Sequence, residues 1–219
     1  MLFDLRSRGR RRTVQVVYLG LALVLGGGLV LFGVGTGSGN GGLLNAFTGS
    51  GSNNQSSAIS QQEKTALKQV KANPNSAVAW GNLEQARYEN ASSVGYDQAT
   101  NTYTAAGKKE LGNVALAWQH YQALTQNPSS SLAILAANAY GTLGQYAQEA
   151  SAWETETAAS PSEVKGFECL AISAYAAKQT RKGDLAAAKA TSMVPKASRK
   201  ALTTEIDTAK TQPTLAAQC

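Results

Sequence analysis

The sequence predicts an all-α protein in which about three helical hairpins stack behind one membrane-spanning helix. Three observations support this fold class. An apolar pattern recurs three times at helical spacing, Pro128, Pro161 and Pro195 follow one another at 33 and 34 residues (161 − 128 and 195 − 161), and a 21-residue uncharged stretch follows an arginine-rich N-terminus. Self-similarity at a period in the thirties is typical of stacked helical hairpins, each of which buries its apolar face against its neighbours.

The recurring pattern is a large apolar residue, a leucine, a small or polar residue and a tyrosine at positions i, i+3, i+4 and i+8. Its copies are Trp80-Leu83-Glu84-Tyr88, Leu132-Leu135-Ala136-Tyr140 and Phe167-Leu170-Ala171-Tyr175. The second copy begins 52 residues after the first (132 − 80), and the third begins 35 residues after the second (167 − 132). This spacing puts the members on one helix face. We therefore expect the repeat core to contain Trp80, Leu83, Leu132, Leu135, Phe167 and Leu170.

The first copy resembles a known repeat. Pro74-Asn75-Ser76-Ala77, leading into Trp80 and Leu83, is similar to the opening of a tetratricopeptide repeat (TPR), whose pattern is Trp-x-x-Leu-Gly-x-x-Tyr, then Ala-x-x-x-Phe, then Pro. Ala117-x-x-x-Tyr121 resembles the second half of that repeat. The sequence departs from the pattern where Glu84 replaces glycine and where the tyrosine falls one residue late. The resemblance implies a TPR-like solenoid of about three repeats and a capping helix.

In the TPR family the first helices of the hairpins line a groove that binds peptides or helices of other proteins. The resemblance therefore implies groove positions at Val78, Gln85, Tyr88 and Glu89 in the first copy, Ala133, Ala137 and Tyr140 in the second, and Lys165, Glu168, Ile172 and Tyr175 in the third. Three tyrosines on one wall would suit protein contacts, because each has an apolar ring and a polar tip. The alternative is that these tyrosines pack between adjacent hairpins.

The uncharged stretch predicts a membrane helix. At 1.5 Å per residue, residues 14–34 would span about 31 Å, which is the thickness of the hydrocarbon core of a bilayer. Five arginines precede the stretch and no charge follows it until Glu63, so we expect a cytoplasmic N-terminus and an extracytoplasmic C-terminal domain in the cell membrane. The alternative is a cleaved signal peptide, which has a shorter apolar region and an Ala-x-Ala-like site after it. We favour an uncleaved signal-anchor.

The expected segments are a basic N-terminus (1–13), the membrane helix (14–34), a Gly/Ser/Asn-rich flexible linker (35–57), the helical domain (58–211) with an insertion (92–104), and a tail (212–219). The insertion, rich in Thr, Tyr and Gly, predicts a loop or small hairpin. Ser60-x-x-Glu63 and Ser160-x-x-Glu163 match the capping box and predict two helix starts. A last helix from Lys196 to Lys210, polar on one side, fits the capping element that a solenoid needs.

Charge and composition argue against several kinds of site. Residues 1–12 carry five arginines and one aspartate, net +4, whereas residues from 58 onward carry 15 Lys and Arg against 13 Asp and Glu, net +2. Nucleic-acid binding needs a concentrated basic face and is not expected. With His120 as the single histidine and no Cys-x-x-Cys, neither a metal site nor a cofactor is expected.

The two cysteines leave an alternative open. Cys169 lies at a helical position between two core residues and fits a small buried apolar residue. A disulfide between Cys169 and Cys219 would form if the domain is extracytoplasmic. Otherwise, Cys219 is a free or intermolecular thiol.

The sequence shows no arrangement of an enzyme active site. His120 fits a surface or packing histidine, and Glu149, Glu154 and Glu156 fit a solvated helix face. We therefore expect a non-enzymatic protein–protein adaptor. Its topology resembles bacterial TPR proteins that accompany the secretion translocon and extracytoplasmic chaperones, which implies a role in export or envelope assembly. The alternative is an envelope scaffold that self-associates through the solenoid, giving a homo-oligomer.

Overall fold

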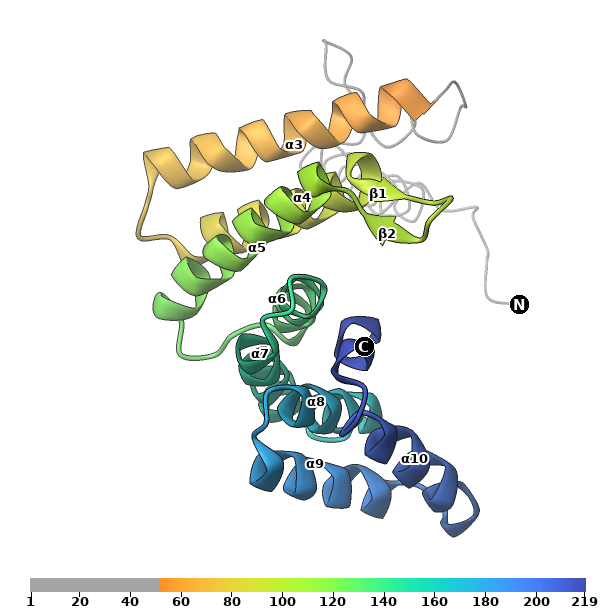
Figure 1. The fold of residues 1–219 in the computed structure, drawn as a ribbon. Helices are drawn as coiled ribbons and strands as arrows, with labels where there is room; N and C mark the ends of the chain where they lie inside the picture. The colour runs from red at the N-terminus through yellow and green to blue at the C-terminus, as the bar shows by residue number, and fades with distance from the viewer. Residues whose placement is uncertain (1–51) are drawn as a thin grey trace, which may run out of the picture. The chain divides into compact units, whose positions relative to one another are not determined.

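The computed structural model describes residues 52–219, of which residues 56–219 form one compact unit (Figure 1). This part is all-α apart from one small β-hairpin, as the sequence predicts. The predicted basic N-terminus, membrane helix (14–34) and most of the linker lie outside the described residues. Among the helices that are described, none combines the length and the apolar character needed to cross a bilayer.

The elements follow in the order α3 (Ser52–Ala72), α4 (Ala77–Val94), β1 (Tyr96–Asp97), β2 (Thr102–Tyr103), α5 (Ala105–Ala123), α6 (Ser130–Thr142), α7 (Tyr146–Ala159), α8 (Val164–Ala176), α9 (Thr180–Met193), α10 (Lys196–Thr208) and the 3-10 helix η1 (Pro213–Gln218). The closest helix pairs are α4 with α5, α6 with α7 and α8 with α9, and α5–α6 and α7–α8 contacts join these hairpins in chain order. The three predicted helix pairs are therefore present and pack in sequence.

The turns inside the second and third hairpins have the same hydrogen-bond pattern. After α6, Gly144 N donates to Gly141 O (3.0 Å) and Gln145 N to Tyr140 O (2.8 Å), with Gly144 at φ +70°. After α8, the equivalent bonds run from Lys178 N to Tyr175 O (2.9 Å) and from Gln179 N to Ala174 O (2.8 Å), with Lys178 at φ +60°. Both are Schellman motifs, and they lie 34 residues apart (178 − 144).

The second and third hairpins each have a contact between a glycine on one helix and a large side chain on the other. A Cβ on Gly141 of α6 would lie 3.0 Å from the carboxyl carbon of Glu149 in α7. In the next hairpin, a Cβ on Gly183 of α9 would lie 2.5 Å from the Tyr175 ring in α8. Each contact thus combines one glycine with one large side chain, and the glycine lies on the first helix in one hairpin and on the second helix in the other.

The first hairpin is closed differently, by the insertion. The insertion forms the predicted small hairpin, in which β1 pairs antiparallel with β2 and Tyr96 lies opposite Tyr103. Thr104 caps α5 by accepting from Gly107 N (3.1 Å), and its own N–H donates to Gly95 O (2.8 Å). The backbones of Gly95 and Gly107 touch, so that a Cβ on either residue would overlap the other.

Neither predicted capping box caps a helix. Helix α3 begins at Ser52, inside the predicted flexible linker, so Ser60 lies within the helix and not at its cap. Helix α8 begins at Val164 rather than after Ser160. Ser160 instead ends α7, where its N–H donates to Glu156 O (2.8 Å) and its hydroxyl donates to Ser130 Oγ (3.0 Å). Residues 212–219, predicted as a tail, contain η1, which packs on α6 and α8.

Trp80, Leu132 and Phe167 occupy equivalent places in the three hairpins. Each lies in the first turn of its first helix and is half-buried. The Trp80 ring stacks on His120 near the end of α5, with 4.1 Å between the ring centroids. Phe167 lies below Lys189 near the end of α9, with 5.7 Å from Nζ to the ring centroid.

The residues predicted to form the repeat core are unevenly buried. Leu83 and Leu170 are buried, whereas Leu132 and Leu135 are half-buried. The largest buried cluster runs from α5 through to η1, and smaller clusters serve α3, α4 and α5.

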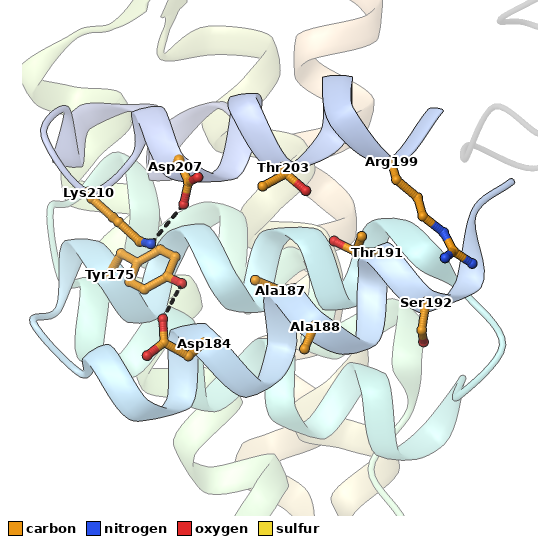
Figure 2. Close-up of a pocket in the computed structure, with 10 residues that line it drawn as sticks. All are labelled: Tyr175, Asp184, Ala187, Ala188, Thr191, Ser192, Arg199, Thr203, Asp207 and Lys210. Carbon is orange, nitrogen blue, oxygen red and sulfur yellow. Dashed lines mark hydrogen bonds and ion pairs between the residues drawn. The ribbon is translucent and has the colours of Figure 1, made fainter. Parts of the chain in front are cut away.

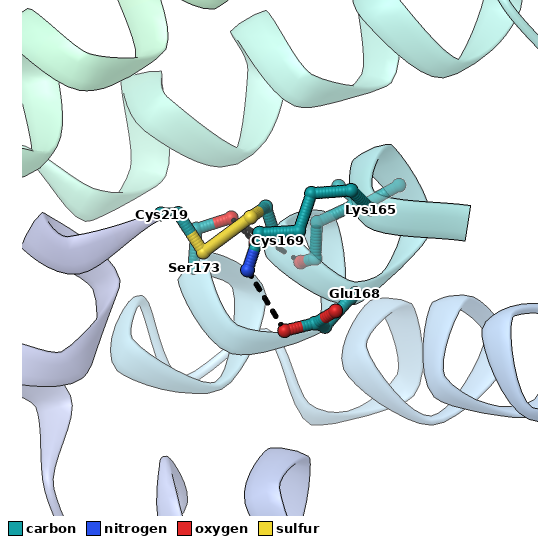
Figure 3. The surroundings of a disulfide bond; sticks show 6 residues. Lys165, Glu168, Cys169, Ser173 and Cys219 are labelled. Carbon is teal, nitrogen blue, oxygen red and sulfur yellow. Dashed lines mark hydrogen bonds and ion pairs between the residues drawn. A yellow bond between two sulfur atoms is a disulfide. The ribbon is translucent and has the colours of Figure 1, made fainter. Parts of the chain in front are cut away.

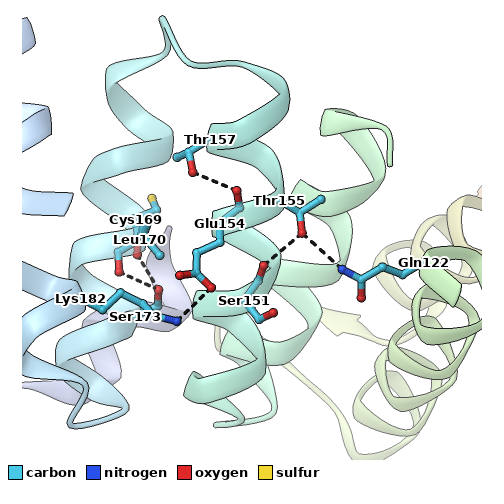
Figure 4. A network of polar contacts seen from close by, with 9 residues as sticks. All are labelled: Gln122, Ser151, Glu154, Thr155, Thr157, Cys169, Leu170, Ser173 and Lys182. Atoms are coloured by element: carbon cyan, nitrogen blue, oxygen red, sulfur yellow. Dashed lines mark hydrogen bonds and ion pairs between the residues drawn. The ribbon is translucent and has the colours of Figure 1, made fainter. Parts of the chain in front are cut away.

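The second helices of the hairpins are joined by polar side chains (Figure 4). Gln122 of α5 donates to Thr155 Oγ1 of α7 (3.3 Å), and Lys182 of α9 pairs with Glu154 of α7 (2.9 Å). Helix α7 is therefore linked by side chains to the second helix of the hairpin on either side of it.

Candidate protein-binding surfaces

The predicted groove positions do not form one exposed wall. Val78, Gln85 and Lys165 are exposed, Tyr88 and Glu89 are half-buried, and Ala133, Ala137, Tyr140, Glu168, Ile172 and Tyr175 are buried. Buried positions are not available to a partner in this structure. The exposed positions lie on α4 and at the start of α8, and they are not brought together by the hairpins between them.

The three tyrosines are engaged between helices. Asn138 Nδ2 of α6 donates to the Tyr88 hydroxyl (3.4 Å), and Gln119 Nε2 of α5 donates to the Tyr140 hydroxyl (3.3 Å). The Tyr175 hydroxyl donates to Asp184 Oδ1 of α9 (2.7 Å). Burial raises the pKa of all three phenols. Tyr88 and Tyr140 thus pack between adjacent hairpins, as the alternative describes, whereas Tyr175 packs between the two helices of the third hairpin.

The C-terminal segment covers the face shared by α6 and α8 (Figures 1 and 3). Cys219 is joined to Cys169 of α8 by a disulfide bond, with 5.6 Å between the Cα atoms. Ala216 is 2% exposed, and Leu215 and Cys219 pack against the large apolar cluster. On α8, Lys165 and Ile172 lie four and three residues from Cys169, on the same helix face. The segment thus occupies the region that the TPR resemblance assigns to a partner.

An open groove lies between α7, α8 and α9. Phe167, Leu170 and Leu185 are its large apolar residues, and its volume is about 500 Å³. Leu185 is 66% exposed. Leu185 therefore leaves apolar surface exposed beside the half-buried Phe167.

Charged side chains rim this groove, which we call the basic groove. Arg181, Lys182 and Lys189 contribute three positive charges and Glu154 one negative charge. Lys182 is paired with Glu154 at 2.9 Å, which leaves Arg181 and Lys189 as the net excess. The rim therefore favours a partner segment that carries carboxylates beside an apolar side chain.

A second groove, of about 430 Å³, lies between α9 and α10 (Figure 2). Small side chains such as Ala187 and Ala188 form much of its wall. At one end, the Tyr175 hydroxyl bonds to Asp184 and Lys210 pairs with Asp207, with 2.7 Å in each contact. These polar groups are already paired, so this groove offers less to a partner than the basic groove does.

The prediction that Glu149 and Glu156 form a solvated face is wrong. They are 1% and 3% exposed, whereas Glu154 is exposed. The burial of Glu149 and Glu156 raises the pKa of each, that of Glu149 to about 8. The Trp153 indole opposes this rise in the pKa of Glu149. The carboxyl groups fit because glycines on neighbouring helices leave room, Gly141 beside Glu149 and Gly166 beside Glu156.

Glu84 is the most strongly perturbed of these carboxyls. It is fully buried in α4, and neither of its carboxylate oxygens has a hydrogen-bond partner among residues 52–219. Burial raises the pKa of Glu84 to about 9, so the carboxyl is protonated at neutral pH. Enclosing a carboxyl without a hydrogen-bond partner lowers the stability of the fold.

No family model, no curated protein and no solved structure matches this chain.

The sequence analysis did not predict the basic groove, although a signal for it was present. Arg181, Leu185 and Lys189 are spaced by four residues, which places them on one face of α9. Such a cationic face with an exposed leucine differs from the polar outer face of a simple surface helix.

Proposed function

We propose that this protein is a membrane-anchored, non-enzymatic adaptor of TPR-like helical hairpins that binds a protein partner on the extracytoplasmic side, in export or envelope assembly. The sequence resemblance supports the repeat type, and the uncharged stretch 14–34 supports the anchor. The observation that carries the binding role is the basic groove. Its occupant is a partner segment with a leucine or phenylalanine flanked by glutamate or aspartate.

Charge and shape both support this occupant. The apolar side chain would cover Leu185 and Phe167, which removes apolar surface from water. Flanking carboxylates would approach Arg181 and Lys189, which speeds association and discriminates against basic segments. Because the rim is exposed, these charges are screened by salt, so binding should weaken as ionic strength rises.

The test uses the full chain in detergent micelles and two labelled peptides. Both carry a central leucine, flanked by glutamates in one and by lysines in the other, and binding is measured by fluorescence anisotropy. We expect the acidic peptide to bind and the basic one to bind at least ~10-fold more weakly. Lys189→Glu should weaken the acidic peptide by a similar factor. Lys200→Glu, which makes the same charge change on α10, is the matched control and should have little effect.

Equal binding of both peptides, or no change with Lys189→Glu, would exclude the basic groove as the site. The alternative function, a self-associating scaffold, predicts a different result. A photo-crosslinker placed at Leu185 would then join two copies of this chain, and light scattering would give a dimer or larger species after subtraction of the detergent.

A further inference from the structure

The face of α6 and α8 beneath the C-terminus has the features of a peptide-binding site. Helix α6 presents Ala133, Ala137 and Gly141, which are buried and small. A Cβ on Gly141 would lie 3.2 Å from the Ala217 Cα, so the approach of the segment depends on the glycine. Surfaces of small residues allow a second backbone to come close over several residues.

The segment that fills this face has a simple chemistry. Residues 213–218 read Pro-Thr-Leu-Ala-Ala-Gln and carry no charge. Ala216 is buried against the helices, whereas Pro213 and Thr214 are exposed. The surface thus accepts a short, uncharged, alanine-containing turn of 3-10 helix, and it differs in chemistry from the basic groove.

One feature of the α6/α8 face destabilises the arrangement in which the C-terminal segment covers it. The Glu149 carboxyl and Ala217 both lie over Gly141. Glu149 is 1% exposed, and its Oε2 has no hydrogen-bond partner in the part of the chain that the structure describes. A buried carboxyl oxygen without a partner costs free energy that hydration would recover. Departure of the segment would let water reach this carboxyl.

The disulfide holds the segment in place. Cys169 is fully buried and Cys219 is half-buried at the edge of the domain (Figure 3). Between α10 and η1 the chain passes through exposed residues such as Thr211 and Gln212. With the disulfide intact the segment is at high effective concentration beside its face, and it excludes a competing peptide.

We propose that the α6/α8 face is a second binding site, for a short uncharged segment of a partner protein, which the chain's own residues 213–219 occupy until the Cys169–Cys219 disulfide is reduced. The reductant is a dithiol, protein or reagent. This site is separate from the basic groove, so each proposal can fail without the other.

Reduction of the disulfide takes two thiol–disulfide exchange steps. A thiolate of the dithiol attacks the Cys219 sulfur, the more accessible of the two, forming a mixed disulfide and releasing the Cys169 thiolate, which takes up a proton. The second thiol of the reductant then loses its proton. Its sulfur attacks the first sulfur of the same reductant, which is bonded to Cys219 in the mixed disulfide. This step releases Cys219, which takes up a proton. Two electrons pass from the dithiol, which leaves as a disulfide, to the two cysteines.

The experiment uses the full chain in micelles, oxidised or reduced with dithiothreitol. The probe is a fluorescein-labelled peptide of residues 211–219 carrying Cys219→Ser. We expect the reduced chain to bind the probe at least ~10-fold more tightly than the oxidised chain, and a chain ending at Lys210 to bind it at least as tightly as the reduced chain does. The control peptide carries Ala216→Glu in addition and should not bind, because it places a charge at a buried position.

Hydrogen exchange on the unmodified chain gives a test that does not depend on variants folding. We expect reduction to remove protection from the amides of residues 215–219 while α6 and α8 stay protected. The proposal is overturned if these amides keep their protection after reduction, or if the reduced and the shortened chain, both helical with cooperative melting, bind the probe no better than the oxidised chain does.

Discussion

The first hairpin is held together by different contacts from those of the two hairpins that follow it. In α6–α9 the helices turn through two equivalent Schellman motifs, share one large apolar cluster and are covered by a disulfide-linked segment. In α4–α5 the turn is replaced by a β-hairpin and a glycine–glycine contact. The apolar residues of these two helices are divided between two smaller clusters and the large one, which includes Trp118 and Tyr121 of α5.

The first hairpin relies more on polar contacts. Glu63 of α3 pairs with Arg87 (3.5 Å) and accepts from Asn90 (2.8 Å), and the Arg87 Nη1 donates to Asn113 O of α5 (3.0 Å). The same hairpin encloses Glu84 without a partner among the described residues. Repeated hairpins can thus keep one arrangement while their stability comes from different sources. We therefore expect α4–α5 to open more readily than α8–α9.

The largest expected effect comes from the disulfide. Cys219→Ser opens a loop of 50 residues and should lower the stability of the α8–η1 region by about 4 kcal/mol, because the unfolded chain gains conformational entropy. Native-state hydrogen exchange should show faster exchange in α8, which still exchanges more slowly than residues 215–219, and little change in α4. Gln218→Ser is the control, since it changes the neighbouring residue and keeps the disulfide. An equal loss in both regions would mean that the domain unfolds as a single unit.

Glu84→Gln should raise stability at pH 7 by about 3 kcal/mol. The unfolded carboxyl titrates near 4.5 and the folded one near 9, so folding takes up a proton between these values, and stability falls as pH rises through that range. The stability lost in this way grows by about 1.4 kcal/mol per pH unit above 4.5, so pH 7 lies partway along the loss. Urea unfolding at pH 5, 7 and 9 measures it.

The Glu84→Gln variant keeps the shape of the side chain and removes its titration, so its advantage should be small at pH 5 and greatest at pH 9. Glu205→Gln, at an exposed position on α10, is the matched control and should track the parent chain. A constant difference at all three pH values would show that Glu84 does not change its protonation on folding.

Gly107→Ala should destabilise the first hairpin by about 2 kcal/mol, because the new Cβ overlaps the Gly95 backbone, which no rotamer change relieves. Gly112→Ala lies on the same helix, where a Cβ meets no atom of the described chain within 4 Å, and should stabilise it by up to ~1 kcal/mol. Thermal unfolding followed by circular dichroism compares the two. Similar effects would mean that the glycine contact does not close this hairpin.

The smallest effect concerns the two Schellman turns. Lys178→Gly should gain about 1 kcal/mol, because glycine adopts positive φ without the clash of a Cβ. Gly144→Ala should lose a similar amount at the equivalent position. Urea titration measures both. If neither changes stability, the two turns are not the points that fix the helix ends in this region.

Much of the fold could be predicted from local patterns. The proline spacing and the helical placement of Trp80, Leu132 and Phe167 each depend on a few neighbouring residues, and the structure confirms the helix pairs that they predict. The capping-box predictions at Ser60 and Ser160 failed because such a motif does not exclude a preceding helical turn or a role in the previous helix. Which of the carboxyls at 149, 154 and 156 are buried depends on glycines in other helices, and the spacing along α7 does not contain that information.

The order of the hairpins follows from the amino-acid sequence alone, because helix periodicity, prolines and turn glycines act within a few residues. Which first-helix positions remain open could not be predicted in that way, since the C-terminal segment reaches across α6 and α8 from a distant part of the chain. The same holds for Leu185, which lies beside Phe167 within a rim of three basic side chains and Glu154. Those surfaces exist only when side chains from separate helices meet, and packing, rather than local preference, brings them together.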